Sequence, residues 1–578
     1  MLLTKHGGDI KPANGAKKLP LKTRETPAES KFDYLLPDLK TQSSARLPDS
    51  PAVVAALKAL GAAMIDQDPT TEPSVIPAIY TYWGQFIDHD MTANTDRDGT
   101  LSDIKADPLS PHDPVKVANG LPNLRRPTFD LDSLYGNGPG LDPSFYCPDP
   151  GPPDRWLYKG AKFRIGRNAA SPGDPIPPVN DLKRDLPRVG DLIASGQLLP
   201  DDFPDALRNA PNRATVAAIA DARNDENLIV AQFHLAFLRF HNKVVDAVTA
   251  YPLAFGLRAR PSVAEVFGAA HRLTRYHYQW LVVHDYLKTV TLPGIVDKVL
   301  IGGNRFYPDL PKHELFAPLE YSVAAFRFGH SMVRGGYDHN RNFGAGPNAF
   351  LPFARFEQLF EFTGNGHRID PVDITKSVPS PLGGTDKTLP SNWIIEWDRL
   401  SSKVDADARH FARKIDTQLV PPVLNMVNQG VGEPSLAIRQ LLRDLSTRNL
   451  LRGYLLSIPT GQAIAAEMGV DPLTEEELKR DNAPAVDAAL ALDNDRLLKQ
   501  TPLWYYVLKE AEVRADGDSL GELGSRIVVE TQIGLLRNDP ESYLYGDTPW
   551  DPSQGVKLPN GDPIVTIRDL LHFVGLPA

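Results

Sequence analysis

Cysteine is almost absent from this sequence, because Cys147 is the only one among 578 residues. A single cysteine excludes an intramolecular disulfide, so the chain is not a small domain held together by disulfides. Long apolar runs are also missing. The most apolar stretches, 228–238 and 280–283, are interrupted by polar residues or fall well short of the roughly 20 residues that cross a bilayer. The composition is that of a soluble globular protein, and we expect no membrane span.

An excess of positive charge is lacking as well. The chain has 62 Lys and Arg against 72 Asp and Glu, which gives a formal net charge of -10. Nucleic acids and anionic membranes need a basic face, so we expect neither as the main partner. The first eight residues lead into polar, Lys-rich and Pro-rich sequence in place of an apolar signal core. This start argues against a conventional cleaved signal and leaves a cytoplasmic location or a non-classical export route open.

Patterns of strands and of nucleotide-binding loops are scarce. Val and Ile runs between turns are few, and no Gly-rich loop follows a strand, so the sequence predicts a mainly α protein with little sheet. Residues 1–48 are predicted to form an N-terminal arm that is partly extended or disordered, and 49–578 one large helical domain with long wrapping loops, chiefly within 97–213. Helical periodicity predicts helices at 53–65, 74–91, 215–250, 263–287, 320–333, 405–428, 436–456, 474–480, 502–514, 522–537 and 566–574.

The segment 83–90, Trp-Gly-Gln-Phe-Ile-Asp-His-Asp, places four polar side chains in a stretch that otherwise has the pattern of a buried helix. Gln85, Asp88 and His89 stand at i, i+3 and i+4 and share one helix face, whereas Asp90 is turned by about 100° from His89. One face can therefore look into a pocket while Asp90 serves a site beside it. The alternative is a hydrogen-bonded core histidine next to a solvated acidic corner.

Three further groupings carry potential chemistry. Asp130 and Asp132 lie close together in a loop, and such hard oxygen ligands suit calcium, which takes about six to eight oxygens; a turn capped by aspartate is the alternative. Arg223 and Glu226 stand at i, i+3, which by itself is also the spacing of a surface salt bridge worth at most about 1 kcal/mol. A second arginine stands three residues before His330 on a predicted helix.

Taken together and in this order, the motifs resemble the animal-type haem peroxidases, a superfamily that also contains cyclooxygenases and fatty-acid dioxygenases. The resemblance runs from about residue 50 to about residue 575. With its single cysteine and the Pro-Thr-Gly-Gln at 459–462, the chain resembles the bacterial members of the superfamily more than the disulfide-bearing secreted animal enzymes. The matching segments are 83–90 for the distal helix, 130–136 for the calcium loop, 223–226 with 240–242 for the catalytic-arginine helix, 327–330 for the proximal helix, 449–453 for the helix behind it, and in addition 390–397 and 524–536.

The resemblance implies haem b as cofactor. His330 would bind the iron, Asn449 would accept a hydrogen bond from the other ring nitrogen of His330, and Arg327 would face a haem propionate. Asp88 and Glu226 stand where family members form ester bonds to haem, so ester-linked haem is expected after exposure to peroxide. A sulfonium link is not expected, because residue 227 is an asparagine where the member with that link has methionine.

The implied activity is that of a haem peroxidase. It would reduce hydrogen peroxide and oxidise small organic or halide donors through a ferryl intermediate, as enzymes of the response to oxidative stress do. His89 would take a proton from bound peroxide and return it to the leaving oxygen. Arg223 would stabilise the charge that develops as the O–O bond breaks, and Gln85 would help to place the distal ligand.

Calcium is the second implied cofactor. Its ligands would be Asp90, Asp130, Asp132 and oxygens of Thr128, and because Asp90 follows His89 the ion would also fix the distal base. One departure from the family stands beside this set. A threonine usual in the family is replaced by Arg126, which offers a backbone carbonyl but no hydroxyl, so calcium occupancy is left open.

Two other functions compete with the peroxidase. A fatty-acid dioxygenase of the same superfamily would place a radical-forming tyrosine three residues before the proximal histidine, and here that position is Arg327. A haem-scavenging or structural protein with a degraded site is the other. The presence of His89, Arg223 and His330 in one chain argues against it.

Overall fold

The protein is described from a computed structural model. It describes residues 3–4, 8–9, 30–66, 73–93, 101–147, 159–168, 181–210, 214–344, 352–364, 389–404, 407–426, 429–430 and 433–576. The predicted mainly α class is confirmed, since the strands are two to five residues long and form small separate sheets. Within the described residues, no helix is both long and apolar enough to cross a membrane.

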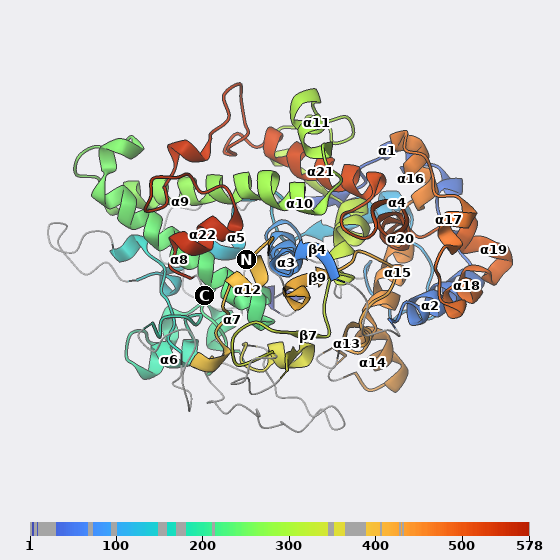
Figure 1. Cartoon of the computed structure of the whole chain (residues 1–578), viewed down its shortest axis with the longest axis horizontal. Coiled ribbons are helices and arrows are strands. Elements are labelled where there is room, and N and C mark those ends of the chain that lie inside the picture. Colours follow the sequence, from blue (N-terminus) through green and yellow to red (C-terminus); the bar gives the residue numbers. More distant parts are fainter. Residues whose placement is uncertain are drawn as a thin grey trace.

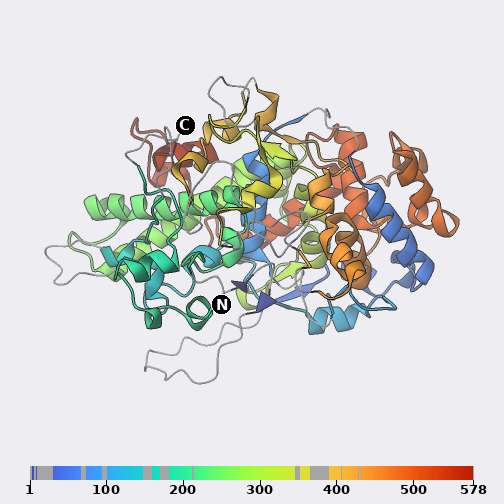
Figure 2. The same ribbon diagram turned by 90° about the horizontal axis from the view of Figure 1, so that it is seen from below.

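The helix α3 (Ile79–Met91) runs through the middle of the molecule. Figures 1 and 2 place it between α8 (Leu228–Ala250) and α9 (Val263–Leu281) on one side and the C-terminal helices on the other. Eleven of its thirteen residues are buried, and the two exceptions are Gln85 and Asp88. A helix that is apolar nearly all round belongs in a core, so these two polar side chains mark the face that looks into a cavity.

The C-terminal helices surround the segment that carries His330. α15 (Leu445–Leu455), α20 (Leu503–Ala515) and α21 (Glu522–Asn538) pack around a π-helical turn, η10 (Glu320–Ala324), and a 3-10 helical segment, η11 (Ala325–His330). The chain breaks helical geometry between the two segments, where Ala324 has φ -129° and ψ -76°. The single helix predicted at 320–333 is therefore two segments, a wider π-helical turn and a tighter 3-10 segment that ends at His330.

Other predicted helices also differ in detail. Residues 74–91 contain the strand β4 (Pro73–Pro77) before α3 begins, because proline cannot supply the hydrogen bonds of a helix interior. Residues 215–250 contain only the 3-10 segment η6 (Ala222–Asp225) before α8, and 263–287 end in the π-helical segment η8 (Val282–Leu287). The helix predicted at 405–428 is wrong. Its described part forms β9 (Phe411–Arg413), paired with β4, and the four-residue α13 (Pro421–Leu424), which starts at a proline pair.

The N-terminal residues described at 30–48 lie against the core. β3 (Ser30–Asp33) pairs antiparallel with β5 (Pro122–Asn123) and parallel with β6 (Phe316–Pro318), and Phe32 is fully buried. The buried carboxylate of Glu320 accepts from the backbone N–H groups of Leu35 at 2.8 Å and Leu36 at 3.4 Å. Apart from the two short strands β1 (Leu3–Thr4) and β2 (Gly8–Asp9), the rest of the predicted arm lies outside the described residues, and the division into arm and domain stays a prediction.

The remaining elements complete the shell around this core. Their bounds are α1 Pro37–Lys40, α2 Pro51–Ala63, α4 Pro114–Gly120, α5 Asp132–Tyr135, α6 Val189–Ala194, α7 Asp205–Arg208, α10 Lys288–Val290, α11 Ile295–Gly302, α12 Asp398–Ser401, α14 Leu436–Arg443, α16 Gly461–Met468, α17 Glu475–Lys479, α18 Pro484–Leu490, α19 Leu492–Lys499, α22 Ile567–Phe573, β7 Gly336–Tyr337 and β8 Ala354–Arg355.

Candidate active site

A cavity lies between α3 and η11. From α3 it is lined by Gln85, Asp88 and His89, and from η11 by Arg327 and His330. Seven of the eight residues predicted to form the catalytic and cofactor site are at or directly behind this cavity, because Glu226 also lines it and Asn449 contacts His330. Its apolar walls are formed by Phe326, Val333, Phe356, Phe360, Val423 and Met426.

His89 is held as a neutral base. Its Nδ1 lies 2.8 Å from Oδ1 of Asn224, and the amide nitrogen of Asn224 lies 3.0 Å from Nδ1 of His234. An amide oxygen only accepts, so His89 carries its proton on Nδ1 and keeps a lone pair on Nε2. Burial, and then the positive charge of Arg223, lowers the pKa of His89 to about 4. Sequence analysis missed Asn224, although its place next to Arg223 was a usable signal.

Arg223 does not line the cavity. Its Nη2 donates to the backbone oxygen of His89 at 2.7 Å and its Nη1 to that of Thr92 at 2.9 Å, while Asp221 forms an ion pair with it at 2.7 Å. The guanidinium therefore lies behind the end of α3, where helix carbonyls lack partners within the helix. It is drawn there because Asp221 is fully buried and needs a cation.

The polar residues beside His89 form a short hydrogen-bonded row. Gln85 donates to Oε2 of Glu226 at 3.5 Å and accepts from the amide of Asn227 at 3.2 Å. Asp88 accepts from the hydroxyl of Thr92 at 2.8 Å. The structure thus brings Gln85, Asp88 and Glu226 together at one wall of the cavity.

On the other wall, His330 is held by neutral groups. The amide nitrogen of Asn449 faces its Nδ1 at 2.8 Å, and the amide oxygen accepts from Nη1 of Arg327 at 3.0 Å. The contact was predicted, but the amide has the reverse orientation, because Arg327 takes the oxygen. Trp504, which sequence analysis missed, donates to the backbone oxygen of Arg327 at 3.1 Å, and its ring lies 6.5 Å from that of His330.

The cavity residues fit a haem group. His89 and His330 supply two imidazoles on different elements, and the walls between them are apolar, as a porphyrin ring requires. Arg327 lines the cavity together with Arg448, a second buried arginine that sequence analysis missed. Two guanidinium groups at one cavity match a ligand with two carboxylates.

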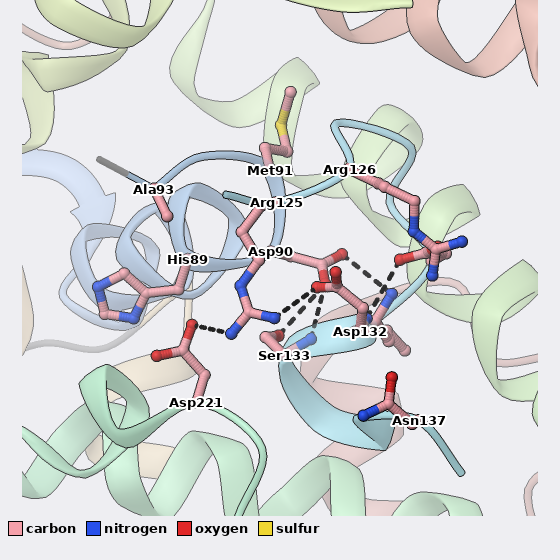
Figure 3. A network of polar contacts seen from close by, with 12 residues as sticks. His89, Asp90, Met91, Ala93, Arg125, Arg126, Asp132, Ser133, Asn137 and Asp221 are labelled. Carbon is pink, nitrogen blue, oxygen red and sulfur yellow. Dashed lines mark hydrogen bonds and ion pairs between the residues drawn. The ribbon is translucent and has the colours of Figure 1, made fainter. Parts of the chain in front are cut away.

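The three carboxylates predicted to bind calcium also come together, and Figure 3 shows two of them, Asp90 and Asp132. Oxygens of Asp90, Asp130 and Asp132 all lie within 4.8 Å of one another. Asp90 is fully buried and accepts from the backbone N–H of Leu131 at 3.1 Å and the hydroxyl of Ser133 at 3.2 Å. Burial, and then repulsion from Asp132 and Asp130, raises the pKa of Asp90 well above its usual range, so the cluster is short of positive charge.

This cluster fits a hard cation, although two arginines already reach it. The buried hydroxyl of Thr128 has no hydrogen-bond partner among the described residues, which leaves one more oxygen for an ion. Arg126, 37% exposed at its side chain, lies 3.0 Å from Asp130, and the buried Arg125 lies 3.2 Å from Asp132. Arg126 thus already balances part of the negative charge of the carboxylates that a calcium ion would otherwise neutralise.

A chain of ion pairs connects the cluster to His89, and Figure 3 shows its part from Asp132 through Arg125 to Asp221. Arg125 bridges Asp132 to Asp221 at 2.6 Å, and Asp221 in turn holds Arg223, which donates to the backbone of His89. Although burial alone would raise the pKa of Asp221, Arg223 and Arg125 hold it well below its usual range. Sequence analysis missed Arg125 and Asp221, because the partners lie 96 residues apart and no local pattern joins them.

Comparison with known proteins gives two matches in sequence. Residues 183–360 match the family model described as animal haem peroxidase. A peroxidase-like protein of Margaritifera margaritifera is 26% identical over 299 residues, which cover 48% of this chain and 34% of the relative. The match therefore spans about a third of the length of that relative.

Solved structures give matches over nearly the whole chain. Peroxidase A from Dictyostelium discoideum has a TM-score of 0.57 at 16% identity, covering 95% of this chain and 94% of its own, which shows a shared fold. A fatty acid alpha-dioxygenase of Arabidopsis thaliana has a TM-score of 0.48 at 15% identity, covering 95% and 77%. The chain is thus similar to the animal-type haem peroxidases, in sequence over residues 183–360 and in fold over nearly its whole length.

Proposed function

We propose that the protein is a haem peroxidase that reduces hydrogen peroxide and oxidises small organic or halide donors. The observation that carries the proposal is His89: a buried imidazole, neutral and fixed in one tautomer by Asn224, lines the same cavity as His330. Bound haem would supply the iron and the redox chemistry. The residues of the chain would hold the haem, orient the peroxide and move protons.

His330 would bind the iron, and Arg327 and Arg448 would pair with the two propionates. For His330 to bind through Nε2, its Nδ1 must carry the proton and donate to the oxygen of Asn449. That oxygen now accepts from Arg327. If Arg327 paired with a propionate, the amide of Asn449 could turn over, and its oxygen could then accept the proton on Nδ1 of His330.

His89 would take a proton from peroxide at Nε2 and return it to the leaving oxygen, which requires the neutral imidazole that burial favours. Gln85 would orient the peroxide from the next turn of α3. Arg223 would act mainly as a positioning residue, because it fixes the carbonyls at the end of α3. To stabilise charge in the cavity directly, it would have to turn away from Asp221.

Asp88 and Glu226 line the cavity and are the residues that would form ester bonds to haem after exposure to peroxide. Asn227 beside them holds the amide of Gln85 and provides no sulfur. Haem-stained denaturing gels after peroxide turnover test this, with Asp88→Val and Glu226→Gln as variants. Complete extraction of haem into acidic butanone from the turned-over wild type would show that both carboxylates stay unlinked.

Calcium would be held by Asp90, Asp130, Asp132 and Thr128 in competition with Arg126. The support is the shortage of positive charge around Asp90 and the Thr128 hydroxyl that lacks a partner. An ion there would reach His89 along two routes: through the chain, because Asp90 follows His89, and through the ion pairs of Arg125 and Asp221.

The decisive experiment is an absorbance spectrum of the purified holoenzyme before and after hydrogen peroxide. We expect a Soret band that shifts with peroxide and recovers when a phenolic donor is added. Oxygen uptake with a fatty acid, without donor oxidation, would instead favour a dioxygenase. Arg327 in place of a tyrosine three residues before His330 is the reason that we prefer the peroxidase.

A further inference from the structure

Three buried aromatic rings lead from the cavity toward the protein surface. Tyr286, from η8, lines the cavity. Its ring lies 5.2 Å from Trp83 and 6.2 Å from Tyr80, and Trp83 lies 5.5 Å from Tyr80. All three side chains are at most 1% exposed. Rings in contact like these provide short steps for an electron through a medium that excludes water.

Gly84 keeps the phenol of Tyr286 at the cavity wall. A Cβ added at Gly84 would overlap the Tyr286 hydroxyl, so any other residue at this position would push the phenol away. Both residues line the cavity. The close approach of helix α3 to Tyr286 therefore depends on glycine at this point.

Tyr80, at the other end, has a base for its phenolic proton. Its hydroxyl donates to Oδ1 of Asp285 at 2.6 Å, and Oδ2 of Asp285 accepts from the backbone N–H of Ile567 at 2.8 Å. Lys403 pairs with the same carboxylate at 2.9 Å, lies 5.2 Å from the centre of the Tyr80 ring and is 48% exposed at its side chain. Tyr80 is thus separated from solvent by one lysine, which follows α12 where that helix packs against α3 and α22 (Figure 1).

The middle ring, Trp83, has no base for its proton in the part of the chain that the structure describes. The indole nitrogen of Trp83 is buried and has no acceptor among the described residues, so its oxidation could not be completed by proton loss. Asp285 raises the pKa of Tyr80 beyond the effect of burial, which keeps the phenol protonated until it is oxidised. An oxidising equivalent that enters this row should therefore come to rest on Tyr80.

We propose that Tyr80 and Asp285 form a second oxidation site, near the surface, for one-electron donors such as phenols that are too large to enter the cavity. The proposal rests on the proposed peroxidase activity, whose peroxide-oxidised haem is the oxidant. One electron would leave Tyr80 through Trp83 and Tyr286 toward the peroxide-oxidised haem, the phenolic O–H bond would break, and the proton would pass to Asp285. The donor at the surface would then supply one electron, Asp285 would return its proton to the phenolic oxygen, and the oxidised donor would lose its own proton to solvent.

Freeze-quench electron paramagnetic resonance of the holoenzyme after hydrogen peroxide tests the radical. We expect a tyrosyl signal that narrows when ring-deuterated tyrosine is incorporated and that falls by about ten-fold or more in Tyr80→Phe. The matched control is Tyr135→Phe. Tyr135 is also buried and hydrogen-bonded to a base, His241 at 2.8 Å, but none of its ring contacts lines the cavity, so this variant should keep the signal.

A second measurement compares a free phenol with the same phenol tethered to a dextran too large for the cavity. Tyr80→Phe and Asp285→Asn should slow oxidation of the tethered phenol by about ten-fold, while oxidation of the free phenol stays within about two-fold of wild type. A wild type that oxidises neither phenol and shows no Soret change would overturn the peroxidase proposal itself. The second site alone would be overturned by a different result. In that case the wild type oxidises the free phenol, and Tyr80→Phe keeps both the radical signal and the rate with the tethered phenol.

Discussion

The two walls of the cavity are built in different ways. His89 stands on a regular helix whose end is fixed by a chain of buried charges, from Asp132 through Arg125 and Asp221 to Arg223. His330 ends a short 3-10 segment and contacts the amide of Asn449 and the ring of Trp504, while the same amide accepts from the guanidinium of Arg327. A change of charge at the cluster of Asp132, whether by mutation, cation or pH, should therefore reach the wall of His89 first.

The largest effect should come from a mutation in the wall of His330, because His330 would bind the iron. His330→Ala should abolish the Soret band of ordinary five-coordinate ferric haem, since among the described residues the only other histidine that lines the cavity is His89, on the opposite wall. His284→Ala is the control, because His284 is partly buried and stacks on Trp280 at 4.3 Å, away from the cavity lining. An unchanged spectrum and unchanged activity in the His330 variant would sink the assignment.

His89→Ala should keep haem bound and slow the reaction with peroxide by about 100-fold or more, because the base for the peroxide proton is lost. Stopped-flow absorbance measures the rate. His277→Ala is a suitable control, since His277 is equally buried but contacts Phe240 and Trp550. A rate equal to wild type would remove His89 from the mechanism.

Asp221→Asn tests whether the ion pairs behind His89 contribute more to stability than the contacts of His330. It leaves Arg125 and Arg223 buried without their shared carboxylate and should lower the free energy of unfolding by about 3–5 kcal/mol. Asn449→Ala removes the hydrogen bonds to His330 and Arg327 but no ion pair, and should cost less, about 1–3 kcal/mol. Urea unfolding of both holoenzyme variants gives the comparison, and equal losses would show that the charged chain contributes no more than a single amide.

Arg126→Thr should raise the affinity for calcium by about ten-fold, since it removes a cation from Asp130 and adds a hydroxyl. Isothermal titration calorimetry measures this without reference to activity. Arg305→Thr serves as control for the loss of a surface arginine, as the guanidinium of Arg305 stacks on Phe306 and its backbone bond to Glu530 is kept in the variant. Equal affinities in all three proteins would mean that Arg126 does not compete with the ion.

The smallest effect concerns pH. Because the pKa of His89 is lowered to about 4, the imidazole stays neutral from pH 7 down to about 5, and the rate with peroxide should stay level over that range. It should fall as the pH drops through about 4, where the base becomes protonated. Asn224→Asp places a negative charge beside Nδ1 and should move the fall to higher pH. A wild-type rate that already falls between pH 7 and 6 would contradict the burial effect.

Local patterns predicted much of the fold and of the site. Gln85, Asp88 and His89 could be grouped because i, i+3 and i+4 share a helix face wherever the helix lies. Arg223 could be named from its motif, but the direction of its side chain could not, since Asp221 and the carbonyls of α3 decide it. The helix predicted at 405–428 failed because pairing with β4 and a proline pair outweighed its apolar pattern. Arg448 and Trp504 reach the site only through packing of distant helices.

The parallel pairing of β3 with β6 has a consequence for how the chain is made. Lys31 pairs with Phe316, and Leu35 finds its acceptor, Glu320, 285 residues later. At about 5–20 residues per second, a ribosome needs roughly 15–60 s to deliver those partners. Phe32 and Leu35, which are buried in the finished protein, must wait that long without their docking site. The wall that carries His330, against which α20 and α21 pack, can likewise close only near the end of synthesis.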